Sequence, residues 1–121
     1  MSQIRDDAWL LDIINAIHFV TEYASTVSED IFSVDHATQN VIIREITVIG
    51  EAVRRLSPGF VAAHPEIPFA PIIAMRNALI HDYDDISLKH VWDSVHFDLP
   101  ILLQTIEPIF SRMRKGSSLR E

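Results

Sequence analysis

Apolar residues recur at every third or fourth position along most of this chain, which is the spacing of one face of an α-helix. The alternating pattern that marks half-buried β-strands is not the prevailing one. Glycine occurs only three times, as Gly50, Gly59 and Gly116, so the sequence offers few flexible turn positions. These features predict an all-α protein in which four or five helices pack as a bundle.

Breaker residues and apolar periodicity divide the chain into segments. Helices are expected over residues 6–24, 35–56, 68 or 69 to 82, and about 88–110, with an acidic link at 28–33 and a short helical turn at 61–64. The last helix has three candidate N-cap residues, Asp84, Asp85 and Ser87, between which the sequence does not choose. Pro100 lies inside its pattern, so a kink or break is expected near Leu99.

Length and composition bound the class of protein. With 121 residues, of which 48% are hydrophobic, the chain suits one domain, expected to span residues 1–115 and to be followed by a short basic tail at 116–121. It contains no cysteine, which excludes disulfides, thiolate metal sites and cysteine nucleophiles. No signal-like start is present, and no apolar run reaches the ~18 residues of a membrane span. A soluble, cytoplasmic protein with no membrane partner is expected.

The charge of the chain is unevenly distributed. The formal net charge is −7, but residues 112–121 carry four basic residues and one acidic residue, so this segment has +3 and the remainder −10. An acidic chain has little general affinity for nucleic acid, because such binding depends on phosphate neutralisation. Any RNA-directed function must therefore rely on a local site. The basic tail is either a solubilising end or an arm that contacts phosphates or a partner.

Residues 75–83 combine four polar side chains suited to phosphodiester chemistry. On a helix, Asn77 and His81 lie side by side, and Arg76 and Tyr83 share a neighbouring stripe, at roughly 100° per residue. Arg76 could clamp a phosphate bidentately, Asn77 could bond one ring nitrogen of His81, and His81 could transfer a proton near neutral pH. The combination suggests cleavage of RNA without a metal ion.

This run resembles the signature of the HEPN ribonuclease toxins, in particular the HepT type. The resemblance extends to residues 49–57, which are similar to the family's central helix, to the loop at 64–68, and to the segments 91–92 and 98–100. Four segments in the family's order are far more specific than an arginine and a histidine five residues apart. The resemblance covers about residues 42–100 and implies a HEPN-type helical bundle.

The resemblance also implies a function and its partners. HepT-like proteins are homodimers that cleave RNA, such as tRNA or mRNA, at a composite site formed by the signature helices of both chains. They act as toxins of type VII-like toxin–antitoxin systems without a cofactor or metal. The resemblance assigns catalysis to Arg76, Asn77 and His81. It also implies that a cognate minimal nucleotidyltransferase, the antitoxin, silences the toxin by transferring AMP to Tyr83, where bulk and phosphate charge would repel RNA.

Each assignment has a structural alternative. His81 could merely stabilise a helix C-terminus, Arg76 could cover apolar surface with its stem, and Tyr83 could be a packed ring. Glu51 could pair with Arg76, orient His81, or be an ordinary surface residue. The alternative function is a non-catalytic HEPN module that binds a nucleotide or a nucleotidyltransferase. No metal site is expected, because the other histidines lack i, i+4 pairing: His18, His36, His64, His90 and His96.

Overall fold

A computed structural model describes residues 5–120 of the chain, without the side chains of residues 83 and 117–120. The helices are α1 (Asp6–Ala24), α2 (Glu29–Val34), α3 (His36–Arg55), α4 (Pro58–Ala63), α5 (Ala70–His81), α6 (Leu88–Asp93) and α7 (Leu99–Arg120). A 3-10 turn, Tyr83–Asp85, precedes α6, and a π-helical segment, Ser94–Asp98, joins α6 to α7. No strand occurs in this part of the chain. The predicted all-α bundle is confirmed.

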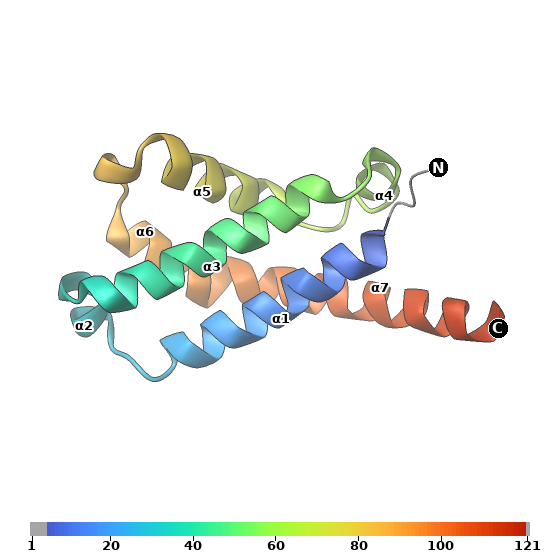
Figure 1. Cartoon of the computed structure of the whole chain (residues 1–121), viewed down its shortest axis with the longest axis horizontal. Coiled ribbons are helices and arrows are strands. Elements are labelled where there is room, and N and C mark those ends of the chain that lie inside the picture. Colours follow the sequence, from blue (N-terminus) through green and yellow to red (C-terminus); the bar gives the residue numbers. More distant parts are fainter. Residues whose placement is uncertain (1–4, 121) are drawn as a thin grey trace.

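The helix α3 lies at the centre of the arrangement. It packs against α1 on one side and α5 on the other, while α7 packs against α1 (Figure 1). The stripe predicted on α1 forms its buried face, and α3 buries a similar stripe of isoleucines at Ile42, Ile46 and Ile49. The bundle therefore follows from the 3.6-residue periodicity of the two long helices. Both α1 and α5 pack against α3, so α3 buries apolar residues toward two neighbours within one chain.

The prediction of an acidic link at residues 28–33 is wrong, because most of this segment forms the helix α2. Ser28 caps this helix by accepting a hydrogen bond from the Ile31 backbone N–H at 3.1 Å. Phe32 is buried and packs against the ring of Trp92, with 5.2 Å between the ring centroids. Six residues are too few for apolar periodicity to show, and one buried phenylalanine holds the helix in place.

Of the three candidate caps for α6, the structure selects Ser87, whose hydroxyl accepts from the His90 N–H at 3.2 Å. The kink or break expected near Leu99 takes the form of a π-helical turn, Ser94–Asp98, between α6 and α7. The Leu99 N–H bonds to the Ser94 carbonyl, five residues back, so the helix widens immediately before Pro100. The wider turn relieves the clash that a proline ring makes with the preceding turn.

The backbone of α7 remains helical up to Arg120, through most of the segment in which a tail was expected. The bounds of α1 are those expected, and those of α3 and α5 differ from the expected ones by one or two residues at each end. No helix in the described residues combines the length and the apolar character that crossing a membrane requires.

Candidate functional site

The site begins with a close approach between two helices. Gly50 on α3 lies directly against Arg76 on α5, and a Cβ atom at position 50 would overlap Cβ and Cγ of Arg76. The backbone of Gly50 lies in the ordinary helical region, so its conformation does not require glycine. Glycine is required because no space is left for a side chain. The contact brings the arginine of one segment beside the Gly-Glu pair of another, and both segments resemble the same family.

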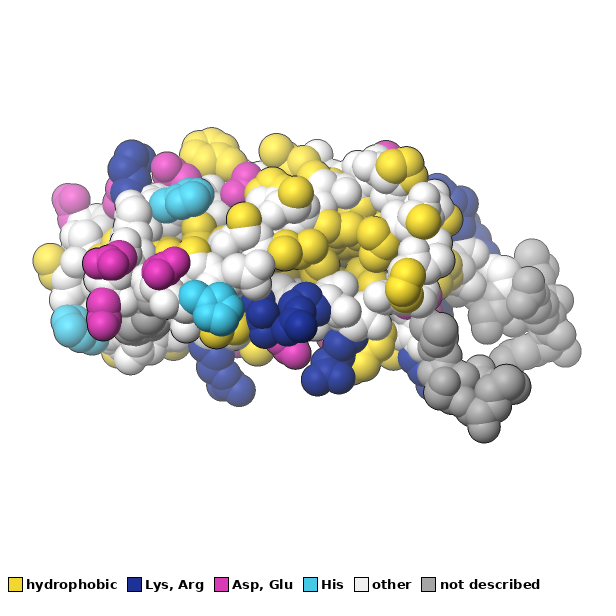
Figure 2. Space-filling model, turned by 90° about the horizontal axis from the view of Figure 1, so that it is seen from above, with side chains coloured by type: hydrophobic (Ala, Val, Ile, Leu, Met, Phe, Trp, Pro, Cys, Tyr) yellow, Lys and Arg dark blue, Asp and Glu magenta, His cyan; other side chains and the backbone are white. Residues whose placement is uncertain are grey.

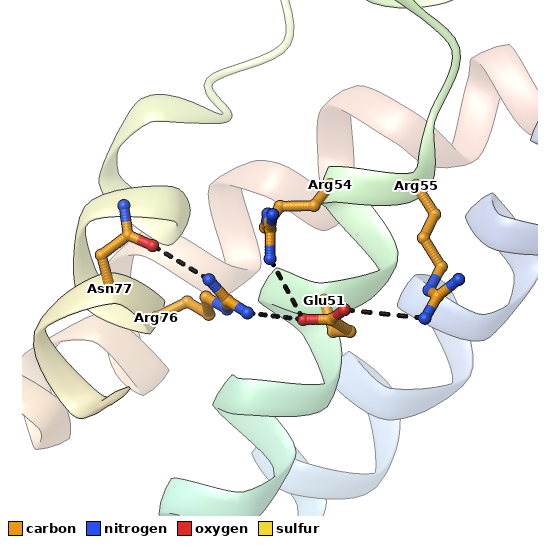
Figure 3. Close-up of polar contacts among 5 residues, drawn as sticks. All are labelled: Glu51, Arg54, Arg55, Arg76 and Asn77. Carbon is orange, nitrogen blue, oxygen red and sulfur yellow. Dashed lines mark hydrogen bonds and ion pairs between the residues drawn. The ribbon is translucent and has the colours of Figure 1, made fainter. Parts of the chain in front are cut away.

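Glu51, the next residue on α3, forms an ion pair with Arg76. The distance from Arg76 Nη2 to Glu51 Oε2 is 2.7 Å, and the Arg76 side chain is only 12% exposed (Figure 3). A largely buried guanidinium requires a partner, because an unpaired buried charge is costly. Of the alternatives left open for Glu51, the structure shows the pairing with Arg76. This pair fixes the position of Arg76 between α3 and α5.

Two further arginines surround the same carboxylate. Arg54 Nη1 lies 3.7 Å from Glu51 Oε2, and Arg55 Nη2 lies 3.7 Å from Oε1 (Figure 3). We call Glu51, Arg54, Arg55 and Arg76 the arginine cluster. With three positive groups and one negative group, it carries a local charge of +2 on a chain of net charge −7. The cluster thus supplies the local positive site that an RNA-directed function would need.

Arg54 and Arg55 belong to the site, although neither was predicted as a site residue from the sequence. Their spacing from Glu51 was the available signal, since residues three and four apart on a helix are neighbours and form ion pairs. The two arginines differ in direction. Arg55 lies over the Trp9 ring of α1, with its guanidinium carbon 5.3 Å from the ring centroid, whereas Arg54 lies on the side of Glu51 that faces Arg76 (Figure 3).

Asn77 does not bond to His81 as predicted. Its Oδ1 accepts a hydrogen bond from Arg76 Nη1 at 3.2 Å (Figure 3). The neighbouring guanidinium is a charged donor, which makes a stronger hydrogen bond than a neutral imidazole. Arg76 therefore uses two of its five N–H donors in these contacts. Its Nε is buried and has no partner among the described residues.

His81 is the last residue of α5, and its side chain is exposed. Within the described part of the chain it forms no side-chain hydrogen bond or ion pair. It lies five residues beyond Arg76, about 7.5 Å further along the helix axis. The structure thus places an open imidazole and a fixed guanidinium on one helix without bringing the two into contact. The backbone at Tyr83 follows in the 3-10 turn, but its side chain lies outside the described residues, so the role expected of it stays a prediction.

A groove of about 450 Å³ between α1 and α3 is lined by Glu51 and Arg55 but not by Arg76. Trp9, Phe19 and Val48 give it apolar walls, and Asp12 and Glu45 add carboxylates. Because carboxylates repel phosphates, this groove is the weaker candidate for RNA. No group of three or more potential metal-ligating side chains gathers within the described residues.

The fold is the all-α bundle expected of a HEPN-type protein, with Arg76 and the exposed His81 on one helix, α5. The family "Ribonuclease HepT-like" matches residues 13–109, and the chain belongs to this family. A "Probable ribonuclease HepT" of Thermococcus cleftensis is 33% identical over 107 residues, covering 88% of this chain and 94% of the relative.

Other relatives support the same family. A protein of Methanocaldococcus jannaschii named "Putative RNase" is 33% identical over 102 residues, covering 84% of each chain. One of the same name from Caldanaerobacter subterraneus is 27% identical over 104 residues, covering 86% of this chain and 93% of the relative. The comparison with solved structures found no significant match. The recognition from sequence is confirmed.

Proposed function

We propose that this protein is a homodimeric, metal-independent endoribonuclease and the toxin of a toxin–antitoxin system. The observation that carries the proposal is the placement of Arg76 and His81. The first is fixed by Glu51 and Gly50, and the second is open to substrate on the same helix. Both belong to a chain of the HepT-like ribonuclease family.

The proposed reaction needs three contributions. A base removes the proton of the ribose 2′-hydroxyl, whose oxygen attacks phosphorus and forms a 2′,3′-cyclic phosphate. An acid donates a proton to the 5′-oxygen as the P–O5′ bond breaks. A cation stabilises the charge that builds up on the phosphoryl oxygens. His81 supplies the base or the acid, and Arg76 supplies the cation, with Asn77 holding its guanidinium.

One chain offers a single His81, so a second imidazole must come from a second copy. Three large apolar side chains on α5 and on the α6–α7 helix are exposed, namely Ile80 at 45%, Phe97 at 64% and Ile101 at 55%. Figure 2 shows hydrophobic side chains over the middle of one face, beside a cluster of Lys and Arg side chains. Burial of such a face between two copies would bring both α5 helices to one composite site.

Tyr83 is the proposed point of control. It begins the turn that follows α5, two residues after His81, so a group attached to it would lie next to the histidine. Transfer of AMP from ATP to its hydroxyl, with release of pyrophosphate, would add bulk and negative charge there. The proposed enzyme for this step is a cognate minimal nucleotidyltransferase.

The second candidate function is a non-catalytic HEPN module that binds a nucleotide or a nucleotidyltransferase. The low exposure of Arg76, 12%, favours it, because Glu51 already occupies part of the guanidinium. End-group analysis separates the two candidates. The ribonuclease yields RNA fragments with 2′,3′-cyclic phosphate and 5′-hydroxyl ends in EDTA, and these ends disappear with His81→Ala. A dimer that binds RNA or nucleotide without producing these ends would be the binding module.

A further inference from the structure

We propose that Arg54 is a phosphate-binding residue of the ribonuclease site and contacts an RNA phosphate in addition to the one bound at Arg76. The inference deepens the proposed function, on which it rests. It concerns how the site holds a single-stranded RNA, and it assigns a role to a residue outside the α5 signature.

The two arginines beside Glu51 Oε2, Arg54 and Arg76, differ in their exposure to solvent. The side chain of Arg54 is 53% exposed, against 12% for Arg76, yet both guanidinium groups approach the same oxygen, Glu51 Oε2. Arg76 makes the short contact, at 2.7 Å, and Arg54 the long one, at 3.7 Å. Glu51 therefore neutralises Arg76 more fully, and Arg54 carries much of the unpaired charge that solvent can reach.

The direction of the side chain supports the same role. Arg54 lies on the side of Glu51 that faces α5, whereas Arg55 is held on the opposite side, over Trp9 (Figure 3). A phosphate that approaches Arg76 from solvent thus meets the Arg54 guanidinium first. Consecutive phosphates of an RNA strand are several ångströms apart, which suits two arginines that share one carboxylate. Bidentate geometry makes the guanidinium well matched to each phosphate.

The charges at the His81 end of the bundle also indicate where an RNA strand would be held. Carboxylates gather on α2 and on the turn after α5: Glu29, Asp30, Asp82, Asp84 and Asp85 (Figure 2). Asp82 directly follows His81, so the surroundings of the histidine do not attract phosphates, and the arginine cluster must anchor the strand that reaches it. Arg54 would then fix the strand on the α3 side of the site, where it affects affinity and not the chemical step.

The test measures RNA binding by full-length protein with His81→Ala, which prevents cleavage. Fluorescence anisotropy with a labelled single-stranded RNA gives Kd over a series of salt concentrations. We expect Arg54→Gln to weaken binding by roughly three- to tenfold at low salt and to reduce the slope of log Kd against log salt by about 0.7, the loss of one phosphate contact. Arg54→Lys should restore most of the slope, because it restores the charge.

Arg44→Gln is the matched control, since Arg44 is an exposed arginine on the same helix and outside the cluster. It should leave both Kd and the slope unchanged. Equal Kd and slope for Arg54→Gln and Arg44→Gln would overturn the inference, as would failure of the His81→Ala protein to bind RNA at all. The proposed function fails separately: if RNA binds through Arg54 but the unsubstituted protein cuts nothing, the phosphate contact stands and catalysis does not.

Discussion

Glu51 on α3 holds Arg76 on α5 through a 2.7 Å ion pair, and this contact links the central helix of the bundle to the signature helix. The pair has two effects that can be measured separately. It satisfies a largely buried guanidinium, which contributes to stability, and it fixes the direction of the cation that the proposed reaction needs.

Replacing Glu51 by Gln should therefore change both stability and turnover. We expect a loss of about 1 to 2 kcal/mol in the free energy of unfolding, because the charge of Arg76 loses its partner. The kcat for RNA should fall by about tenfold with little rise in KM, since the residue positions Arg76 and does not touch RNA. Denaturant titration and steady-state kinetics measure the two effects. Glu45→Gln, on the same helix, serves as the control. A raised KM with unchanged kcat would contradict the positioning role.

Gly50→Ala tests the close approach of α3 and α5. The added Cβ overlaps Cβ and Cγ of Arg76, and Cβ is fixed by the backbone, so no change of rotamer relieves that overlap. Separation of the helices should cost roughly 1 to 3 kcal/mol of stability and displace Arg76. The same substitution at Gly59 meets no atom within 4 Å and should be neutral or slightly stabilising. Equal melting temperatures for the two variants would show that the contact is loose.

The proposed dimer face can be tested at Ile101. This side chain is 55% exposed, so Ile101→Glu should leave the monomer fold intact but prevent association. Analytical ultracentrifugation should show a dimer for the unsubstituted protein and a monomer for the variant, with loss of RNA cleavage. Val34→Glu is the matched control, because Val34 is 76% exposed on α2 at the end of the bundle. A dimeric, active Ile101→Glu would place the interface elsewhere.

Asp35, the N-cap of α3, predicts a dependence of stability on acid pH. Hydrogen bonds from the Thr38 hydroxyl and then from the Thr38 backbone N–H lower the pKa of Asp35 below its usual value of 3.8. A lowered folded-state pKa gives stability that is present above the pKa of the unfolded state and is lost as pH falls through the pKa of the folded state.

Asp35→Asn keeps a good cap but does not titrate. Its melting temperature should fall less than that of the unsubstituted protein on acidification below about 3.8. Asp12→Asn, at an exposed carboxylate on α1, should show the full decrease, and parallel curves for all three proteins would refute the assignment.

The fold was largely predictable because long amphipathic helices show a clear apolar periodicity in the sequence. The bounds expected for α1, 6–24, are those observed, and those of α3 differ by one residue at each end. The helix α2 was missed, since six residues carry too little periodicity and its stability depends on Phe32 meeting Trp92 from a distant segment. The interruption near Leu99 was predicted as a kink or break, but its form, a π-helical turn, was not. A π-helical turn is a local adjustment that the apolar pattern does not reveal.

Several residues of the candidate site could be named from the sequence, but most of the contacts between them could not. Pairing of Glu51 with Arg76 was one of three alternatives left open, and the structure shows that pairing, with Gly50 also lying against Arg76. The partner of Asn77 was not predicted correctly, because helical spacing places His81 beside it but does not rank the competing donor on Arg76. The part played by Arg54 depends on the relative exposure of two guanidinium groups, which only the packed helices define.

The central claim is that His81 moves a proton during RNA cleavage that needs no metal. The most direct measurement is the single-turnover rate of cleavage of transfer and total RNA, in EDTA, by unmodified dimer, with His81→Ala and the exposed-histidine control His90→Ala in parallel. The account predicts cleavage by the unsubstituted protein and by His90→Ala, and a rate lower by about 10² to 10⁴-fold for dimeric His81→Ala. Intact RNA with the unmodified dimer, or equal rates for all three proteins, would contradict it.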